Sequence, residues 1–244
     1  MEKVIVLLRD AERDEAWCSQ LRGAVADKIL ALGVRGLTVN VRDDAVRASL
    51  MTLTTLDPPV VAVVGVWVQQ SYGEQAGTAI ALLSEQCASA AAYLVTESVP
   101  LAPPQIESGS PTGSRAASRT APRTRGLANI ALLRRPDGLT HEAWLALWQL
   151  DHTQVAIDTQ NTFGYTQNVV WRTLTPDPPR IDGIVEELFP AEATTDLHAF
   201  FGAADDLELD DRMSRMIAST SAFGANTNID TVPTSRYVLR TPFG

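Results

Sequence analysis

The sequence is poor in the residues that mark disulfide-rich and metal-binding proteins. It contains 2 cysteines and 3 histidines in 244 residues. Cys18 and Cys87 lie in segments expected to be helical and lack the spacing of metal ligands, so we expect reduced, packed thiols. A histidine-based metal site would need carboxylates to complete its ligand set. We therefore expect neither a disulfide framework nor a bound metal.

Positive charge is also scarce, since the formal net charge is -9 at pH 7. Nucleic acids and anionic membrane surfaces bind clustered lysine and arginine, so neither is an expected partner. The exception is RAASRTAPRTR, residues 115–125, with four arginines and no acid, inside a stretch rich in proline and serine. Such a composition is typical of a solvated linker, which we place at 101–125, and a binding patch is the alternative.

Long hydrophobic runs and cofactor motifs are missing as well. The segment MEKVIVLLRD has only five consecutive apolar residues, too few for a signal peptide or a membrane span, so a cytoplasmic location is expected. The sequence has no P-loop, no dinucleotide-binding glycine fingerprint, no G-x-S-x-G elbow and no His-Glu-x-x-His. These absences argue against a flavin or nicotinamide enzyme.

What the chain does contain is an internal repeat and, with 45% hydrophobic residues, ample material for a core. KVIVLLR (3–9) parallels NIALLRR (129–135), and each is followed by a helical segment containing Glu-Ala-Trp, at 15–17 and 142–144. GLTVNVR (36–42) parallels GYTQNVVWR (164–172), and Asp-Pro-Pro precedes a further strand in both halves, at 57–59 and 177–179. A second helical region and a closing strand complete each half, which predicts domains at 1–100 and 126–244.

The predicted order of elements is βαββαβ, given twice. Such a unit forms a four-stranded antiparallel sheet with both helices on one face and leaves the other face apolar and uncovered. Two sheets on one chain can cover each other, whereas two independent units would each expose a large apolar patch. We therefore predict an α+β fold in which two tandem ferredoxin-like units form an intramolecular dimeric α/β barrel. A monomer suffices for this arrangement, and a homodimer remains open.

The second half also carries a family resemblance. LLRRPDGLTHEAWLALWQLDH, then GYTQNVV, then DGIVEELF, within residues 127 to 240, resemble the EthD-like branch of the dimeric α/β-barrel superfamily. The first half resembles the same superfamily more weakly, chiefly through the repeat. The resemblance implies a ferredoxin-like fold, a barrel cavity, and cofactor-independent chemistry or binding of small, often aromatic or polyketide-like molecules.

Comparing the halves points to candidate catalytic residues. Superposing the two Glu-Ala-Trp tripeptides matches Asp151 with Ala24 and His152 with Val25 on a helix. Superposing the two Asp-Pro-Pro tripeptides matches acidic residues of the second half with apolar residues of the first, namely Asp182 with Ala62 and Glu186 with Val66. An unpaired buried carboxylate costs several kcal/mol, so these replacements call for a compensating role. We predict His152 as a general acid-base, oriented by Asp151 or Asp182, with Glu186 as a second proton carrier or a polar contact.

Each of these residues also has an ordinary structural interpretation. A single histidine at the edge of an apolar helix face is commonly a packed or capping residue, and the acids could satisfy each other or reach solvent at the barrel mouth. The residues predicted to contact a substrate are Trp144, Trp148, Tyr165, Asn129 and Gln167, although core packing is an alternative for Trp144.

The predicted function is a cofactor-free lyase or isomerase acting on a small hydrophobic carbonyl compound by enolisation, dehydration or decarboxylation. Two alternatives stay open: a non-catalytic protein that holds a hydrophobic molecule, and a cofactor-independent monooxygenase acting on an electron-rich aromatic compound.

Overall fold

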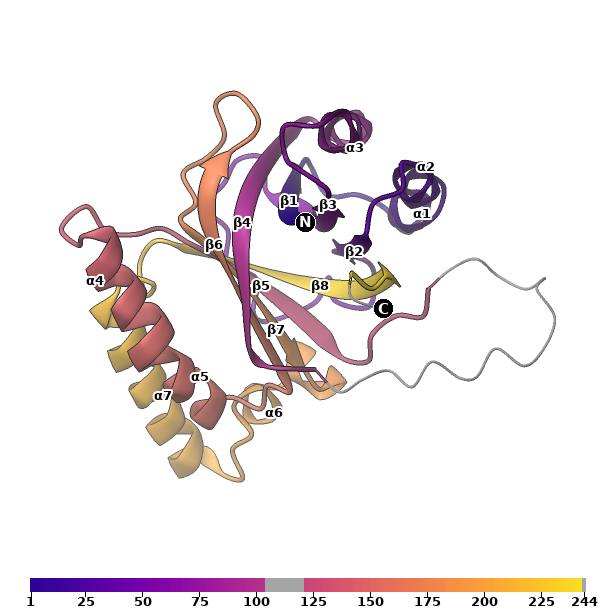
Figure 1. Ribbon diagram of the computed structural model, residues 1–244. Coiled ribbons are helices and arrows are strands. Elements are labelled where there is room, and N and C mark those ends of the chain that lie inside the picture. The colour runs from indigo at the N-terminus through magenta and orange to yellow at the C-terminus, as the bar shows by residue number, and fades with distance from the viewer. Residues whose placement is uncertain (104–120, 243–244) are drawn as a thin grey trace.

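The computed structural model describes residues 1–103 and 121–242 as a closed barrel with helices on its outside (Figure 1). The first half contains β1 (Glu2–Arg9), a helix in three parts, β2 (Gly36–Val41), β3 (Val60–Val68), α3 (Glu74–Ser84) and β4 (Ser89–Leu101). The three-part helix is α1 (Glu15–Gln20), the π-helical η1 (Leu21–Val25) and α2 (Ala26–Ala31). The Asp14 side chain caps its start by accepting a hydrogen bond from Trp17 N.

The second half repeats this order. It contains β5 (Leu127–Leu133), α4 (His141–Leu145), the π-helical η2 (Ala146–His152), α5 (Thr153–Thr159), β6 (Gly164–Thr173) and β7 (Gly183–Phe189). Between β7 and β8 (Ile229–Arg240) lie the 3-10 turn η3 (Ala191–Thr194), α6 (Leu197–Phe201) and α7 (Asp206–Ala222). The predicted order of elements is therefore present in both halves.

The strand order confirms the predicted fold class. Around the barrel the strands run β1-β3-β2-β8-β5-β7-β6-β4, and every pairing is antiparallel. Each half contributes its fourth, first, third and second strand in that order, as a ferredoxin-like unit does. The two sheets join where β2 pairs with β8 and where β4 pairs with β6, so closure leaves neither sheet with an unpaired edge.

Because side chains alternate between the two faces of each strand, the protein has two kinds of hydrophobic core, one outside the barrel and one inside it. One face of each strand packs against helices on the outside, as in the cluster that contains Val64 and Val66 with Leu21 and Ile29. The other face points into the barrel, where Ile5 and Tyr93 of the first half meet Ile130 and Ile184 of the second. The barrel interior is therefore shared by both halves. Within the described ranges, no helix is long and apolar enough to cross a membrane.

The segment predicted as a linker, 101–125, is only partly described. Arg115 and Arg119 lie outside the described residues. Arg123, by contrast, donates from Nε to Ser235 Oγ at 2.6 Å and from Nη2 to Gly126 O at 2.8 Å, so this end of the segment lies against β8. The two cysteines are free thiols, with Cys18 buried.

Candidate functional site

The structure does not form the predicted cluster of His152 with Asp182 and Glu186. His152 is buried outside the barrel, between η2 and α7, where its Nδ1 lies 2.9 Å from Ser219 Oγ and its ring packs against Phe223 at 4.8 Å. Burial lowers the pKa of His152 to about 4, which keeps the imidazole neutral. The prediction of one acid-base cluster was wrong because the helix lies on the outer face of the sheet, whereas Glu186 points into the barrel.

The two aspartates that were expected to orient this histidine lie elsewhere. Asp151 is exposed on η2. Asp182 precedes β7, where its Oδ2 accepts a hydrogen bond from Arg135 N at 2.9 Å and forms an ion pair with Arg180 Nε at 3.3 Å. Neither carboxylate hydrogen-bonds or pairs with His152 in the described part of the chain, and catalytic roles for the three residues stay predictions.

The residues predicted to contact a substrate do gather, but beneath the helices. Asn129 and Tyr165 are the cross-strand partners of Glu187 on β5 and β6, so the three side chains share the outer face of the sheet. Gln167 lies on the same face and donates from Nε2 to Thr153 Oγ1 at 2.7 Å. Trp144 and Trp148 cover Gly183 on the neighbouring strand. We call Asn129, Tyr165, Gln167, Glu187, Trp144 and Trp148 the outer cluster.

Glu187 is the most perturbed acid of the outer cluster. Its side chain is buried, with 7% of the residue exposed, and no hydrogen bond to it is found among the described residues. Burial raises the pKa of Glu187 to about 8, so the carboxyl is protonated near neutral pH. Burial, with the nearby Glu187, also raises the pKa of Tyr165. Asn129 Oδ1 and Trp144 Nε1 are buried without hydrogen-bond partners in the described part of the chain.

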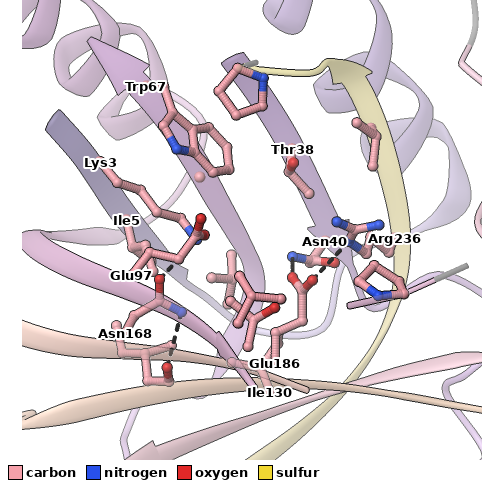
Figure 2. Close-up of a pocket in the computed structure, with 18 of the residues that line it drawn as sticks. Lys3, Ile5, Thr38, Asn40, Trp67, Glu97, Ile130, Asn168, Glu186 and Arg236 are labelled. Atoms are coloured by element: carbon pink, nitrogen blue, oxygen red, sulfur yellow. Dashed lines mark hydrogen bonds and ion pairs between the residues drawn. The ribbon is translucent and has the colours of Figure 1, made fainter. Parts of the chain in front are cut away.

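An open cavity occupies one end of the barrel interior, with a volume of about 230 Å³ (Figure 2). Ile5, Val63, Ile130 and Ile184 give it apolar walls, and Trp67 lies near its entrance. Both halves supply these side chains. Of the nine residues predicted for the site, only Glu186 lines this cavity.

The first polar group in the cavity is built around Lys3. Lys3 Nζ donates to Glu97 Oε2 at 2.5 Å and to Asn168 Oδ1 at 2.8 Å, and it lies 4.7 Å from the centre of the Trp67 ring. Asn168 Nδ2 donates to Ile184 O at 3.1 Å, which fixes the amide with its oxygen toward Lys3. Lys3 thus uses two of its three donors on the protein. We call Lys3, Glu97 and Asn168 the lysine group.

The second polar group lies opposite and is built around Arg236, as Figure 2 shows. Arg236 Nε forms an ion pair with Glu186 Oε1 at 2.7 Å, and Asn40 Nδ2 donates to Glu186 Oε2 at 2.8 Å. Both oxygens of Glu186 are therefore engaged. For the two Nη atoms of Arg236, no protein partner is found within residues 1–103 and 121–242. We call Arg236, Glu186 and Asn40 the arginine group.

The two groups occupy corresponding positions in the repeat. β2 and β6 share the pattern Gly-x-Thr-x-Asn-Val at 36–41 and 164–169, which places Asn40 and Asn168 at equivalent positions facing the cavity. The strand pairing within each half then shows which residues are equivalent: Gly65 of the first half corresponds to Glu186 of the second, and Glu97 corresponds to Arg236. The asparagines are common to both groups, whereas the charge at the fourth strand is reversed.

Sequence reasoning missed the contribution of the first half to the site. The Asp-Pro-Pro match placed Glu186 on Val66, whereas the strand pairing places it on Gly65, because β3 begins immediately after Pro59 and β7 begins later. A slip of one residue exchanges the two faces of a strand. The repeated Gly-x-Thr-x-Asn-Val was the available signal, since its Thr and Asn share one face.

Comparisons with known proteins agree with the fold. No protein-family model matches the sequence, and no curated protein matches it. An anthrone oxidase-like protein has a similar structure, with a TM-score of 0.50 and 9% identity, covering 100% of this chain and 94% of that one. A mutant chlorite dismutase from Candidatus Nitrospira defluvii gives a TM-score of 0.47 and 10% identity over 98% of this chain and 91% of that one.

The fold is that of the dimeric α/β barrels. At these identities the likeness extends to the fold alone, and the narrower EthD-like resemblance is not confirmed by it. Within the described residues, no group of three or more His, Cys, Asp or Glu side chains is arranged to hold a metal ion.

Proposed function

We propose that this protein is an enzyme that moves a proton on a small, largely apolar carbonyl compound bound in the barrel cavity. The observation that carries the proposal is the ion pair between Lys3 and Glu97 in a cavity that also has apolar walls. The EthD-like resemblance of the second half supports the same class, a lyase or isomerase that works without a cofactor.

The lysine group has the parts needed for enolisation. The Lys3 ammonium retains one N–H that neither Glu97 nor Asn168 accepts, and this donor can stabilise charge that develops on a carbonyl oxygen. Glu97 Oε1 accepts no hydrogen bond among the described residues and can take the proton from the carbon next to the carbonyl. The proton passes from carbon to carboxylate and back, so no electrons leave the substrate and no oxidant is needed.

The apolar walls strengthen this chemistry. Ile5, Val63, Ile130 and Ile184 exclude water from the substrate and lower the local dielectric, which increases the effect of a fixed ammonium on a developing enolate. Asn168 holds the ammonium in place, because its own amide is tied to Ile184 O. It is a positioning residue.

The test uses α-proton exchange in D2O, followed by proton NMR, on small ketones such as phenylacetone and on 2-oxo acids such as phenylpyruvate. The wild-type protein is expected to accelerate exchange, and Glu97→Gln to reduce the rate roughly 10²- to 10⁴-fold, as loss of a general base does. The exposed Glu192→Gln is the matched control and should leave the rate unchanged.

Two results would contradict the proposal. One is equal exchange rates with wild-type protein and Glu97→Gln. The other is tight binding of these compounds without accelerated exchange, which would favour the alternative of a non-catalytic binding protein.

The outer cluster supports a second candidate, cofactor-independent oxidation of an electron-rich aromatic compound. Its support is the set of buried, unpartnered polar atoms, Asn129 Oδ1 and Trp144 Nε1, beside the protonated Glu187. Anthrone is a suitable probe, because a structural neighbour is named anthrone oxidase-like. Oxygen uptake with anthrone that disappears in Asn129→Ala and persists in Glu97→Gln would assign oxidation to the outer cluster.

A further inference from the structure

We propose that the compound bound in the barrel cavity is a small oxo acid whose carboxylate and ketone are several bonds apart, with the carboxylate on Arg236 and the ketone on Lys3. The proposal rests on the proposed function and adds the charge and orientation of the substrate. It is carried by the arginine group, which takes no part in the proton transfer described above.

Arg236 is prepared to receive a carboxylate. Its side chain is 18% exposed, and Nε lies 2.7 Å from Glu186 Oε1 in an ion pair, although the Nε–H makes no hydrogen bond among the described residues. Asn40 donates to the other oxygen of Glu186 at 2.8 Å, so both carboxylate oxygens already have a protein contact. The Nη atoms, for which the described residues provide no partner, are the donors that bind a carboxylate in the bidentate geometry of guanidinium.

Glu186 orients the side chain of Arg236 and offsets its charge. The ion pair with Glu186 restricts the guanidinium of Arg236, so less side-chain entropy is lost when a ligand binds. Glu186 also offsets the charge of Arg236 while the cavity is empty. Its corresponding residue in the first half is Gly65, which indicates that the barrel itself does not require an acid here.

The charge reversal between the halves defines the orientation of the ligand. At corresponding positions on the fourth strands, Glu97 repels a carboxylate and Arg236 attracts one. A carboxylate is therefore expected at the arginine group, which leaves the ketone of the same molecule for the ammonium of the lysine group. The two groups lie on opposite sides of the cavity (Figure 2), so a ligand that contacts both has its ketone and its carboxylate several bonds apart, as a 4-oxo acid does.

The experiment compares two probes that share a phenyl ring and a ketone. The oxo acid 3-benzoylpropionate carries a carboxylate where butyrophenone carries a methyl group. By isothermal titration calorimetry, the wild-type protein is expected to bind 3-benzoylpropionate at least tenfold more tightly than butyrophenone. This advantage should fall below twofold in Arg236→Gln and persist in the exposed Arg215→Gln, while butyrophenone binding stays the same in all three proteins.

Removing Arg236 alone leaves Glu186 unpaired in a half-buried position and can unfold the protein. The double variant Arg236→Gln/Glu186→Gln removes both charges together and should also lose the advantage. Addition of salt should weaken 3-benzoylpropionate binding and leave butyrophenone binding unchanged.

The outcomes separate this inference from the proposed function. Equal affinity for the two probes, with α-proton exchange still accelerated, would overturn the inference and leave the proposed function standing. A carboxylate advantage that survives in the double variant would likewise overturn the role of Arg236. Failure of both probes to bind would overturn both proposals.

Discussion

At the scale of single residues, Glu187 shows how far one side chain can depart from its ordinary chemistry. It occupies the outer face of β7, and strand pairing matches it with Val66, a residue of the apolar core in the first half. A carboxyl in such a place is stable only as the neutral acid, since a charge would be buried without a partner. The raised pKa of Glu187, about 8, follows from this burial.

Glu187 makes the stability of the protein depend on pH. In the unfolded chain the carboxyl ionises near its ordinary pKa of 4.5, whereas in the folded protein it stays protonated to about 8. The free energy of unfolding should therefore be highest below pH 4.5 with respect to this group and fall as pH rises toward 8, by on the order of a few kcal/mol. In Glu187→Gln this part of the pH dependence should be absent.

Urea denaturation at several values from pH 5 to pH 8.5 measures this dependence. Glu192→Gln, which changes an exposed acid, should behave as the wild-type protein does. If wild type and Glu187→Gln lose stability in parallel as pH rises, Glu187 is ionised in the folded protein.

At the level of secondary-structure elements, the helix formed by α4, η2 and α5 packs on β7, and this packing depends on one glycine. A Cβ atom at Gly183 would lie 2.7 Å from Trp148 Cη2 and 3.1 Å from Trp144 Cη2, so the strand accepts the two indoles only without a side chain. The indoles themselves lie 4.9 Å apart, centre to centre. Both halves have a π-helical segment in this helix, η1 and η2, and such segments are frequent at functional sites.

Gly183→Ala should displace the tryptophans and destabilise the protein by about 1–3 kcal/mol, the usual cost of overpacking a core. Gly77→Ala in α3 is the control, because no atom lies within 4 Å of the added Cβ, and a helical alanine gains about 0.5–1 kcal/mol over glycine. Thermal unfolding followed by circular dichroism measures both. An unchanged melting temperature in Gly183→Ala would show that the indoles have room to move.

At the scale of the whole molecule, the barrel interior belongs to neither half alone. Ile5, Leu7 and Tyr93 from the first half pack in one cluster with Ile130 and Ile184 from the second. The cavity depends on the same arrangement, since Lys3 and Glu97 come from the first half and their partner Asn168 from the second. Separation of the halves would expose the apolar inner face and divide both polar groups.

Residues 1–103 produced alone should therefore self-associate or aggregate, because an exposed apolar sheet face seeks a partner. Size-exclusion chromatography with light scattering measures this, with the full chain as the reference. A stable, folded monomer of this fragment would contradict the view that the two sheets need each other.

Much of this architecture could be predicted from the sequence. The repeat of short strands, Glu-Ala-Trp helices and Asp-Pro-Pro turns indicates βαββαβ twice, and the requirement to cover two apolar sheet faces indicates closure. The local sequence pattern and the need to bury apolar side chains determine these features, so they can be predicted from the sequence. The candidate catalytic residues could not be placed in this way. Helix periodicity predicts that the face carrying His152 and Asp151 is buried, but it does not predict which other element that face packs against.

The two units, their order and the apolar alternation of their strands follow from local propensity and from the cost of exposing apolar surface, so the amino-acid sequence is enough to predict them. Which side chains share the cavity is a property of the tertiary fold. That depends on strand register, where one residue exchanges inside for outside, and on the two junctions β2–β8 and β4–β6, which bring Lys3 to Asn168 and Asn40 to Glu186 across more than a hundred residues.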